Sequence, residues 1–250
     1  YKKSNFAFIK INPEIAIGKL NKKTLNFEYN ANYNIINNLN RCGYKKLKNN
    51  MYFEALLPRI NAIVNLDEMD INKFNKNTRN KIKKGIRKGL VLEKADQSKI
   101  GILAGFLQDN LNRDSYFYND LYNVFNKTDD VDYFLVKVNY KDYLINSQNY
   151  YNYELNRNSH LNDKMLHRVN ANIINAKMSS DKSLLAYKND IAEASRFLNS
   201  NITTYVAGAM VIKYDNRITI QISGFDRELK RYAANYFLYF AILAHYKNEY

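Results

Sequence analysis

The sequence predicts a mixed α/β (α+β) fold that carries an inserted helical hairpin. Apolar segments with the alternation typical of strands occur early and late in the chain, at residues 6–11, 133–138 and 203–213. An apolar helix is predicted to close the chain at 228–246. Between about 142 and 198 the pattern is helical throughout and poor in Gly and Pro, which indicates two long paired helices.

The length and the charge of the chain limit the classes of function that it can have. The 250 residues suffice for one large domain or two small ones. A hydrophobic content of 46% and a charged content of 25% are typical of a soluble globular protein. The formal net charge of +14 predicts anionic partners, which include nucleic acid, nucleotide-linked substrates and an anionic membrane surface.

Metal and disulfide chemistry are not predicted. Cys42 is the one cysteine, which excludes a disulfide framework and a cysteine-based metal site. The three histidines, His160, His167 and His245, are dispersed, so no metal site is expected from them. The most apolar helix, 232–246, falls short of the roughly 20 residues that cross a bilayer. Nothing resembles a signal peptide, and a cytoplasmic protein is therefore expected.

Both ends of the chain show strands and turns. The first part is predicted to contain strands at 6–11, 52–57 and 61–66. A short helix is predicted at 34–41. Gly43 follows the helix as a C-terminal glycine. The last part is predicted to hold a second strand at 217–223, joined to the preceding strand by a turn at Asp215-Asn216.

A basic helix is predicted at 73–88. Eight Lys or Arg fall in these sixteen residues with no acid among them. Asp70 is expected to cap the helix, because its side-chain oxygen accepts free N–H groups, and Gly89 ends it before a strand at Leu90–Glu93. A surface that concentrates positive charge is suited to phosphates. A solvated helix face is the alternative that charge alone leaves open.

The predicted hairpin has an apolar seam on each arm. The seam residues step by three and four: Leu166, Val169, Ile173, Ala176, Leu184, Tyr187, Ile191, Ala194 and Leu198. Ser179-Ser180-Asp181 separates the two runs and offers an N-cap. A first arm of roughly 30 residues would be about 45 Å long, so it must protrude from a compact domain.

Several motifs, taken in order, resemble the Fem family of aminoacyltransferases, which build the peptide bridges of bacterial peptidoglycan. The segment Phe6-Ala-Phe-Ile-Lys-Ile-Asn12-Pro13 is similar to a family strand that ends in Asp-Pro. Thr78-Arg79-Asn-Lys-Ile-Lys-Lys-Gly-Ile-Arg-Lys-Gly-Leu-Val91 resembles the family's Thr-Arg-x-x-Ile-x-x-Ala-x-x-x-Gly-Val segment. Arg113-Asp114 with the aromatic residues that follow, and the closing strand–strand–helix unit at 205–246, are also similar.

The resemblance implies two acetyltransferase-like lobes that share a cleft. Residues 1–94 would form the last part of the first lobe, and 95–250 most of the second, with the hairpin inserted at about 142–198. The implied reaction moves an aminoacyl group from aminoacyl-tRNA to the pentapeptide stem of a lipid-linked or nucleotide-linked peptidoglycan precursor. Aminoacyl-tRNA would be a co-substrate, and no cofactor is expected. Contact with the inner face of the membrane, and assembly with itself or with related transferases, are further expectations.

The resemblance also implies site residues, although it assigns no catalytic residue. Arg113 matches a family arginine beside the precursor, and a guanidinium suits a diphosphate or a carboxylate. The residues expected to line the substrate site are Arg113, Tyr116, Phe117, Tyr118, Asn12, Gln221 and Ser223. The residues expected to contact phosphates of precursor or tRNA are Arg79, Lys83, Lys84 and Arg87. A salt bridge to Asp114 is the alternative for Arg113, and core packing is the alternative for the three aromatic residues.

The chain departs from the family at several positions. Asn12 stands where the family usually has Asp, and an amide cannot hold a proton as a carboxylate does. Gln221 replaces a strand tyrosine, and Ser223 replaces the first glycine of a Gly-Gly turn. A family lysine would lie beyond Tyr250, and the first strands of the first lobe are missing. The chain is therefore expected to be truncated at both ends or divergent.

Three classes of function remain open. The first is the transferase, for which a cleft with Arg113 and the aromatic residues facing the basic helix is expected. The second is a non-catalytic relative that serves as a scaffold or partner subunit. The third is a general tRNA-binding or nucleic-acid-binding protein that uses the 73–88 helix. An acetyl-coenzyme A acetyltransferase is disfavoured, because the chain has no Gly-rich loop for the pyrophosphate.

Overall fold

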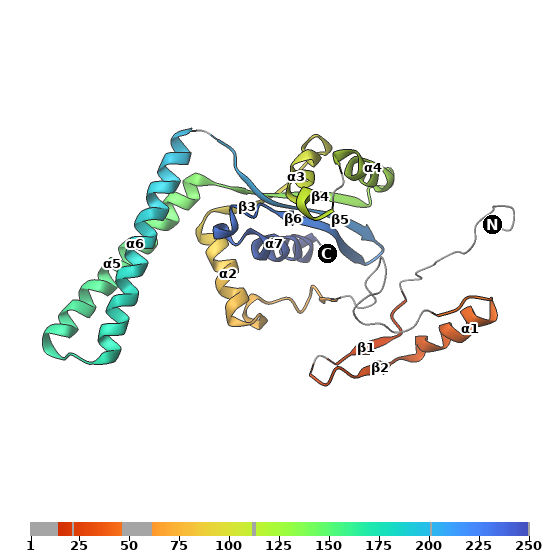
Figure 1. The fold of residues 1–250 in the computed structure, drawn as a ribbon, viewed down its shortest axis with the longest axis horizontal. Coiled ribbons are helices and arrows are strands. Elements are labelled where there is room, and N and C mark those ends of the chain that lie inside the picture. The colour runs from red at the N-terminus through yellow and green to blue at the C-terminus, as the bar shows by residue number, and fades with distance from the viewer. Residues whose placement is uncertain (1–14, 22, 47–61, 112–113, 201, 250) are drawn as a thin grey trace. The chain divides into compact units, whose positions relative to one another are not determined.

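The computed structural model describes residues 15–21, 23–46, 62–111, 114–200 and 202–249. The chain divides into two compact units, residues 1–63 and 64–250 (Figure 1). The mixed helix and sheet fold predicted from the sequence is confirmed. The division into lobes at residue 94 stays a prediction; in the structure, residues 64–94 belong to the second unit.

The first unit contains a small antiparallel sheet and a short helix. Its elements are β1 (Gly18–Leu20), β2 (Phe27–Tyr29), the 3-10 helix η1 (Ala31–Asn34) and α1 (Ile35–Arg41). The helix predicted at 34–41 is therefore confirmed, and Gly43 after it has a φ of 88°, as a C-terminal glycine requires. The strands predicted at 6–11 and 52–57 lie outside the described residues.

The strand predicted at 61–66 is wrong for its described part. Residues 62–66 form no strand, and Ile63 and Val64 are exposed without a neighbouring strand to bond to among the described residues. Leu66 packs instead against the core of the second unit. Apolar residues alone did not produce a strand here, because a strand needs a partner for its backbone N–H and C=O groups.

A four-stranded antiparallel sheet organises the second unit. Its strands lie in the order β3, β4, β5 and β6, with these bounds: β3 Leu90–Lys94, β4 Val131–Val138, β5 Tyr205–Tyr214 and β6 Arg217–Phe225. All four were predicted within a few residues. Asp215 has a φ of 52° in the tight turn between β5 and β6, where the sequence predicted Asp215-Asn216. The inserted hairpin follows β4 and precedes β5, so its two ends lie at the same end of this strand pair.

The two faces of this sheet carry separate hydrophobic cores. Side chains alternate along β4, with Phe134 and Val136 in one core and Tyr133 and Leu135 in the other. The first core is closed by α7 (Ala234–Glu249), and the second by α3 (Ile100–Leu111) and α4 (Ser115–Asn126). Figure 1 shows α3 and α4 on one side of the sheet and α7 on the other.

The basic helix lies on the α7 side of the sheet. It is α2 (Lys76–Arg87), and it is preceded by the 3-10 helix η2 (Ile71–Lys73). Gly85 lets α2 approach α7 closely, because a Cβ there would lie 3.0 Å from the Cβ of Phe237. Asp70 caps η2 rather than α2. The N-cap of α2 is Asn75, whose side-chain oxygen accepts the amide of Thr78 at 2.8 Å.

Two other helices begin at residues that the sequence did not predict. α4 starts at Ser115, because the Asp114 carboxylate accepts the amide of Phe117 at 3.1 Å. α7 starts at Ala234 rather than at 228. Asp226 instead binds the amides of Glu228 and Leu229, and the 3-10 helix η4 (Lys230–Tyr232) follows. The remaining 3-10 helix, η3, spans Gln97–Lys99 before α3.

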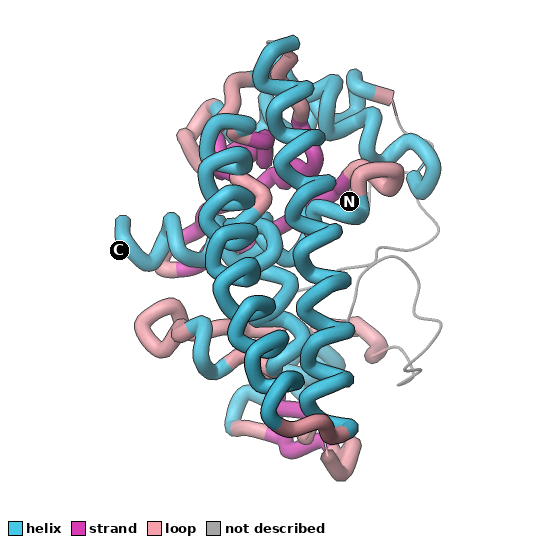
Figure 2. The backbone as a smooth tube through the Cα atoms, turned by 90° about the vertical axis from the view of Figure 1, so that its left-hand side faces the viewer, coloured by secondary structure: helices cyan, strands magenta, loops and turns pink. Residues whose placement is uncertain are grey.

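The inserted hairpin consists of α5 (Tyr140–His167) and α6 (Ala171–Ser200). The two helices run side by side, as Figure 2 shows, and stand away from the sheet (Figure 1). At 1.5 Å per residue, the 28 residues of α5 extend roughly 42 Å. A protruding hairpin of this length was predicted, and it is confirmed with slightly wider bounds than 142–198.

The turn of the hairpin lies at 168–170 rather than at Ser179-Ser180-Asp181. Asn170 provides the cap, because its side-chain oxygen accepts the amide of Ile173 at 3.0 Å. Ser180 lies within α6 and is buried, with its hydroxyl 3.0 Å from the amide nitrogen of Asn158 on α5. The seam between the arms is therefore partly polar. Because the turn lies at 168–170, the predicted seam residues Leu166 and Val169 lie at or beside it and are exposed.

Candidate functional site

The cations of α2 form a basic pocket where this helix meets the hairpin. The pocket has a volume of about 320 Å³ and is lined by Asn80, Lys83, Lys84, Arg87 and Tyr150. The first four residues recur at spacings of three and four, so they share one face of α2. Tyr150 reaches the pocket from α5. No carboxylate is among these five lining residues, which makes the pocket suited to an anion.

Arg87 joins the pocket to the hairpin. Its guanidinium carbon lies 4.9 Å from the ring centre of Tyr187 and 5.6 Å from that of Tyr150, which are cation–π distances. Its Nη2 atom lies 3.7 Å from the Asp190 carboxylate. Its Nε atom is buried and donates to no acceptor within the described residues. The planar group is therefore held in place by two rings while part of its donor capacity stays unused.

Crowding of like charges affects Lys84. Partial burial lowers the pKa of its ammonium, and the charges of Lys88, Lys81 and Arg87 lower it further, while Asp190 acts in the opposite direction. The pocket therefore carries an excess of positive charge that the protein itself does not neutralise. A bound phosphate would supply the missing anion and would raise this pKa again.

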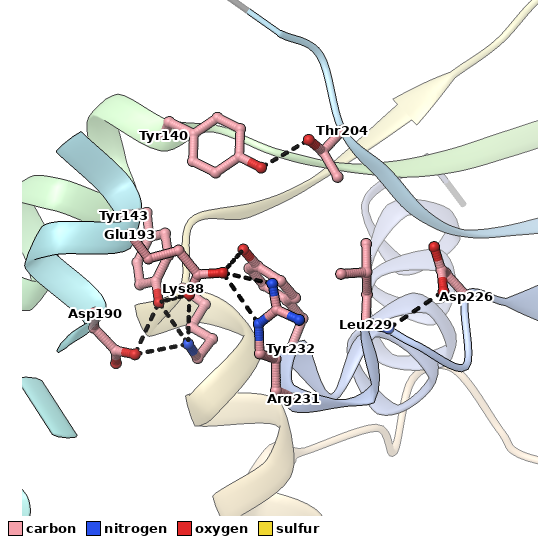
Figure 3. Close-up of polar contacts among 10 residues, drawn as sticks. All are labelled: Lys88, Tyr140, Tyr143, Asp190, Glu193, Thr204, Asp226, Leu229, Arg231 and Tyr232. Atoms are coloured by element: carbon pink, nitrogen blue, oxygen red, sulfur yellow. Dashed lines mark hydrogen bonds and ion pairs between the residues drawn. The ribbon is translucent and has the colours of Figure 1, made fainter. Parts of the chain in front are cut away.

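A buried polar cluster fixes the end of α2 to the base of the hairpin (Figure 3). Lys88, which follows α2, is 4% exposed and lies 2.8 Å from Asp190 and 3.8 Å from Glu193, both on α6. Its ammonium also donates to the Tyr143 hydroxyl and lies 4.7 Å from the centre of that ring. Burial, together with the nearby carboxylates of Asp190 and Glu193, raises the pKa of Tyr143, so this phenol stays protonated.

The same cluster extends to η4 before the closing helix. Glu193 accepts hydrogen bonds from Arg231 at 2.6 Å and from the Tyr232 hydroxyl at 3.0 Å (Figure 3). Burial opposes the charged form of Glu193, but these hydrogen bonds and the charge of Lys88 hold its pKa below the usual value. Three segments that are distant in sequence, at Lys88, at 190–193 and at 231–232, are thereby joined by charged contacts.

The three aromatic residues predicted for the substrate site do not line one surface together. Tyr116 is 76% exposed, while Tyr118 is fully buried in the core between α3, α4 and the sheet. Phe117 lies between these extremes and makes an edge contact with Tyr118 at 5.3 Å. The core-packing alternative therefore describes Tyr118. Because α4 and α2 lie on opposite faces of the sheet, the second unit does not bring these aromatic residues to the basic helix.

Ser223 and Gln221 lie in the edge strand β6. Gln221 is exposed, and the Ser223 hydroxyl lies 2.6 Å from the Tyr239 hydroxyl of α7. The expected glycine turn at 223–224 is wrong, since both residues pair with β5. Gly224 is needed for packing, because a Cβ there would lie 3.0 Å from Phe106 and 3.1 Å from Leu107 on α3.

The remaining predicted residues are Arg79, Arg113 and Asn12. Arg79 does not line the pocket; its Nη1 atom donates to the carbonyl of Asn72 at 2.7 Å and closes the turn before α2. Arg113 and Asn12 lie outside the described residues, so their roles stay predictions. The basic pocket thus holds Lys83, Lys84 and Arg87 of the four predicted phosphate contacts.

The Lys88 cluster was not predicted. Lys88 had been counted only as one of eight cations, and its two acidic partners lie 102 and 105 residues later. One signal was present, because Asp190 and Glu193 flank the predicted seam residues Ile191 and Ala194. Acids beside the inward face of a helix are expected to have partners, since a buried charge without one is costly.

The described part of the chain contains no group of three or more His, Cys, Asp or Glu side chains arranged to hold a metal ion. Within the same residues, no helix combines the length and the apolar character needed to cross a membrane.

Comparison with known proteins identifies relatives along nearly the whole sequence. The model of the FemAB family matches residues 1–249. A lipid II:glycine glycyltransferase of Staphylococcus epidermidis is 20% identical over 246 residues, which cover 94% of this chain and 56% of the relative. The protein of the same name from Staphylococcus aureus is 23% identical over 144 residues, which cover 53% of this chain and 31% of the relative.

The chain spans about half the length of the glycyltransferase from Staphylococcus epidermidis. A crystal structure of FemX is also similar, with 18% identity and a TM-score of 0.49, and the alignment covers 74% of this chain and 48% of FemX.

Proposed function

Because the chain belongs to the FemAB family, we propose that it takes part in aminoacyl transfer to a peptidoglycan precursor, in the formation of interpeptide bridges. The donor in this proposal is an aminoacyl-tRNA, and the acceptor is an amine on the peptide stem of a lipid-linked precursor. The lipid-linked acceptor is favoured over a nucleotide-linked one, because the relatives from two staphylococcal species are named lipid II:glycine glycyltransferases.

The reaction is an acyl transfer from an ester to an amine. The neutral acceptor amine attacks the ester carbonyl, a C–N bond forms, and the C–O bond to the tRNA ribose breaks. The proton that the amine loses goes to the ribose oxygen, which departs as a hydroxyl. The protein must place the two reactants together and stabilise the developing oxyanion. It must also bind two polyanions, the tRNA and the diphosphate of the precursor.

The observation that carries the proposal beyond the family match is the basic pocket of α2. Lys83, Lys84 and Arg87 converge on one space whose lining residues include no acid. Phosphate oxygens are the expected ligands of such a group, and the planar Arg87 guanidinium, which contacts two tyrosine rings, is suited to them. The Lys88 cluster supports this role, since it fixes the pocket's two sides to each other.

The proposal is tested by transfer of a radiolabelled amino acid from charged tRNA to the precursor. The intact protein is incubated with glycyl-, alanyl-, seryl- or leucyl-tRNA and either lipid-linked or nucleotide-linked precursor, with uncharged tRNA plus the free amino acid as the control. Label is expected in the lipid-linked precursor only when the tRNA is charged.

Each alternative function has its own outcome in this assay. No label in either precursor with any of the four tRNAs would contradict the transferase and favour a non-catalytic relative. Label confined to the nucleotide-linked precursor would contradict the proposed acceptor. Tight tRNA binding that ignores aminoacylation, without transfer, would favour a general tRNA-binding protein.

A further inference from the structure

The tip of the hairpin exposes aliphatic side chains. We use "hairpin tip" for residues 164–170, which include the end of α5 and the turn to α6. Leu166 is 82% exposed and Val169 is 63% exposed. The sequence predicted both as seam residues, yet in the structure neither is covered by the hairpin. At the end of a protruding element, these two aliphatic side chains are open to an apolar partner.

Basic residues alternate with these aliphatic residues. Lys164, His167 and Arg168 lie within the same seven residues. Over the wider stretch 161–178 there are three Lys or Arg and one acid, Asp163. Apolar side chains flanked by cations are typical of a segment that enters the boundary between headgroups and acyl chains of an anionic bilayer.

The geometry of the hairpin allows the tip to reach a surface while the sheet of the second unit stays away from it. α5 and α6 have 28 and 30 residues and pair along their lengths, so the tip lies roughly 40 Å from the base of the hairpin. Figures 1 and 2 show the tip at the free end of the two helices, beyond the sheet and the helices that cover it. A narrow end with two aliphatic residues suits shallow insertion between lipids.

We propose that the hairpin tip inserts Leu166 and Val169 into an anionic membrane surface, with Lys164 and Arg168 at the headgroups. A second copy of this chain is a poorer occupant, because each copy carries the same net charge of +14 and the same basic tip. The proposal concerns lipid binding and is independent of the transfer reaction.

The absence of tryptophan from the sequence makes a direct test available. In Leu166→Trp the new side chain is the one tryptophan, and its fluorescence reports the polarity around the tip. The probe is a vesicle of phosphatidylglycerol and phosphatidylcholine, compared with a vesicle of phosphatidylcholine alone. Emission is expected to shift to shorter wavelength with the anionic vesicle and to shift less with the neutral one.

Leu185→Trp is the matched control. Leu185 is also largely exposed, at 62%, but it lies on α6 about fifteen residues from the turn, or roughly 20 Å along the hairpin. Its emission is expected to stay unchanged. No shift for Leu166→Trp with either vesicle would overturn the proposal. Equal shifts at both positions would also overturn it, since the hairpin would then lie flat on the bilayer.

A second measurement separates lipid from protein as the occupant. Flotation of the variant Leu166→Asp/Val169→Asp with anionic vesicles is expected to show about tenfold weaker binding than the unsubstituted protein. A blue shift of Leu166→Trp that needs no vesicle and grows with protein concentration would show that a second copy covers the tip. That result, or unchanged flotation of the double variant, would contradict the membrane contact.

Discussion

The Lys88 ammonium lies 2.8 Å from a carboxylate oxygen of Asp190, although 102 residues separate the two in the sequence. Lys88 directly follows α2, and Asp190 lies on the second arm of the hairpin. This contact joins the basic helix to the hairpin, whose first arm carries Tyr150 of the basic pocket.

Removal of the Lys88 charge is expected to destabilise the second unit. In Lys88→Met, Asp190 and Glu193 would lose a buried partner, and the loss in free energy of unfolding is expected to be about 3 kcal/mol. Urea denaturation followed by circular dichroism measures this, with Lys141→Met at an exposed position of α5 as the control. The double variant Lys88→Met/Asp190→Leu should recover about half of the loss. A cost equal to that of the control would mean that the ion pair contributes nothing.

Gly89 is expected to tolerate no side chain. Its φ is 67°, and a Cβ would lie 2.4 Å from the Asn139 carbonyl oxygen and 2.7 Å from the Tyr143 amide nitrogen. Gly89→Ala should therefore lower the free energy of unfolding by more than about 2 kcal/mol. Gly101→Ala is the control, because no atom lies within 4 Å of its Cβ position, and alanine favours the helix by about 0.5 kcal/mol or more. Similar stabilities of the two variants would contradict the reported geometry.

The Glu93 carboxylate is expected to make stability depend on pH. Hydrogen bonds from Lys137 and Lys99, both at 2.5 Å, lower its pKa below the ordinary value of 4.5. A lowered pKa in the folded state means that the stabilisation is present above pH 4.5 and is lost as the pH falls through the folded value. Glu93→Gln should therefore be less stable than the unsubstituted protein near pH 7, with a smaller difference in acid.

Urea denaturation over a pH series gives this comparison. The exposed acid Glu228, changed to Gln, is the control. The hydrogen bond to Glu93, together with one to Tyr205, raises the pKa of Lys99. The stabilisation from the Lys99 charge is therefore lost only at alkaline pH, as the pH rises above its ordinary value of 10.5. A Glu93→Gln deficit that stays constant from neutral pH into acid would rule out the ionic contribution.

Arg113 is expected to bind the precursor, on the strength of the family resemblance. Arg113→Ala should raise the Michaelis constant for the precursor about tenfold or more and change the turnover number by less than about twofold. Steady-state transfer kinetics test this, and Arg217→Ala, at the exposed first residue of β6, is the control. If both kinetic parameters of Arg113→Ala match those of the control, Arg113 has another role.

Local patterns predicted most of the second unit. The alternation along β4 and the apolar run of α7 depend on a residue's near neighbours, so the sequence alone is sufficient for them. N-caps were harder to choose. Asp70 and Asn75 are both suitable caps ahead of the basic helix, and only the structure shows that the first serves η2 and the second α2.

The hairpin turn and the Lys88 cluster depend on contacts across the chain. Ser179-Ser180-Asp181 looked like a turn because small polar residues usually avoid a helix seam, yet Ser180 is buried through its hydrogen bond to Asn158. In the sequence Lys88 is one of eight cations, and only its ion pairs with Asp190 and Glu193 on α6 distinguish it from the others. For Tyr118 the packing of α4 on the far face of the sheet selects the core-packing alternative, whereas Tyr116 stays exposed and its role stays a prediction.

The salt dependence of tRNA binding tests most directly whether the α2 pocket holds phosphates. Glycyl-tRNA is titrated with the protein across a series of KCl concentrations, and the logarithm of affinity is plotted against the logarithm of salt. For Lys83→Gln/Lys84→Gln/Arg87→Gln the slope is expected to be smaller in magnitude by about 2 to 3. The control Lys127→Gln/Lys141→Gln/Lys182→Gln, at exposed positions, is expected to keep the slope of the unsubstituted protein. An unchanged slope in the pocket variant would contradict the role of α2 in binding and return it to a solvated helix face.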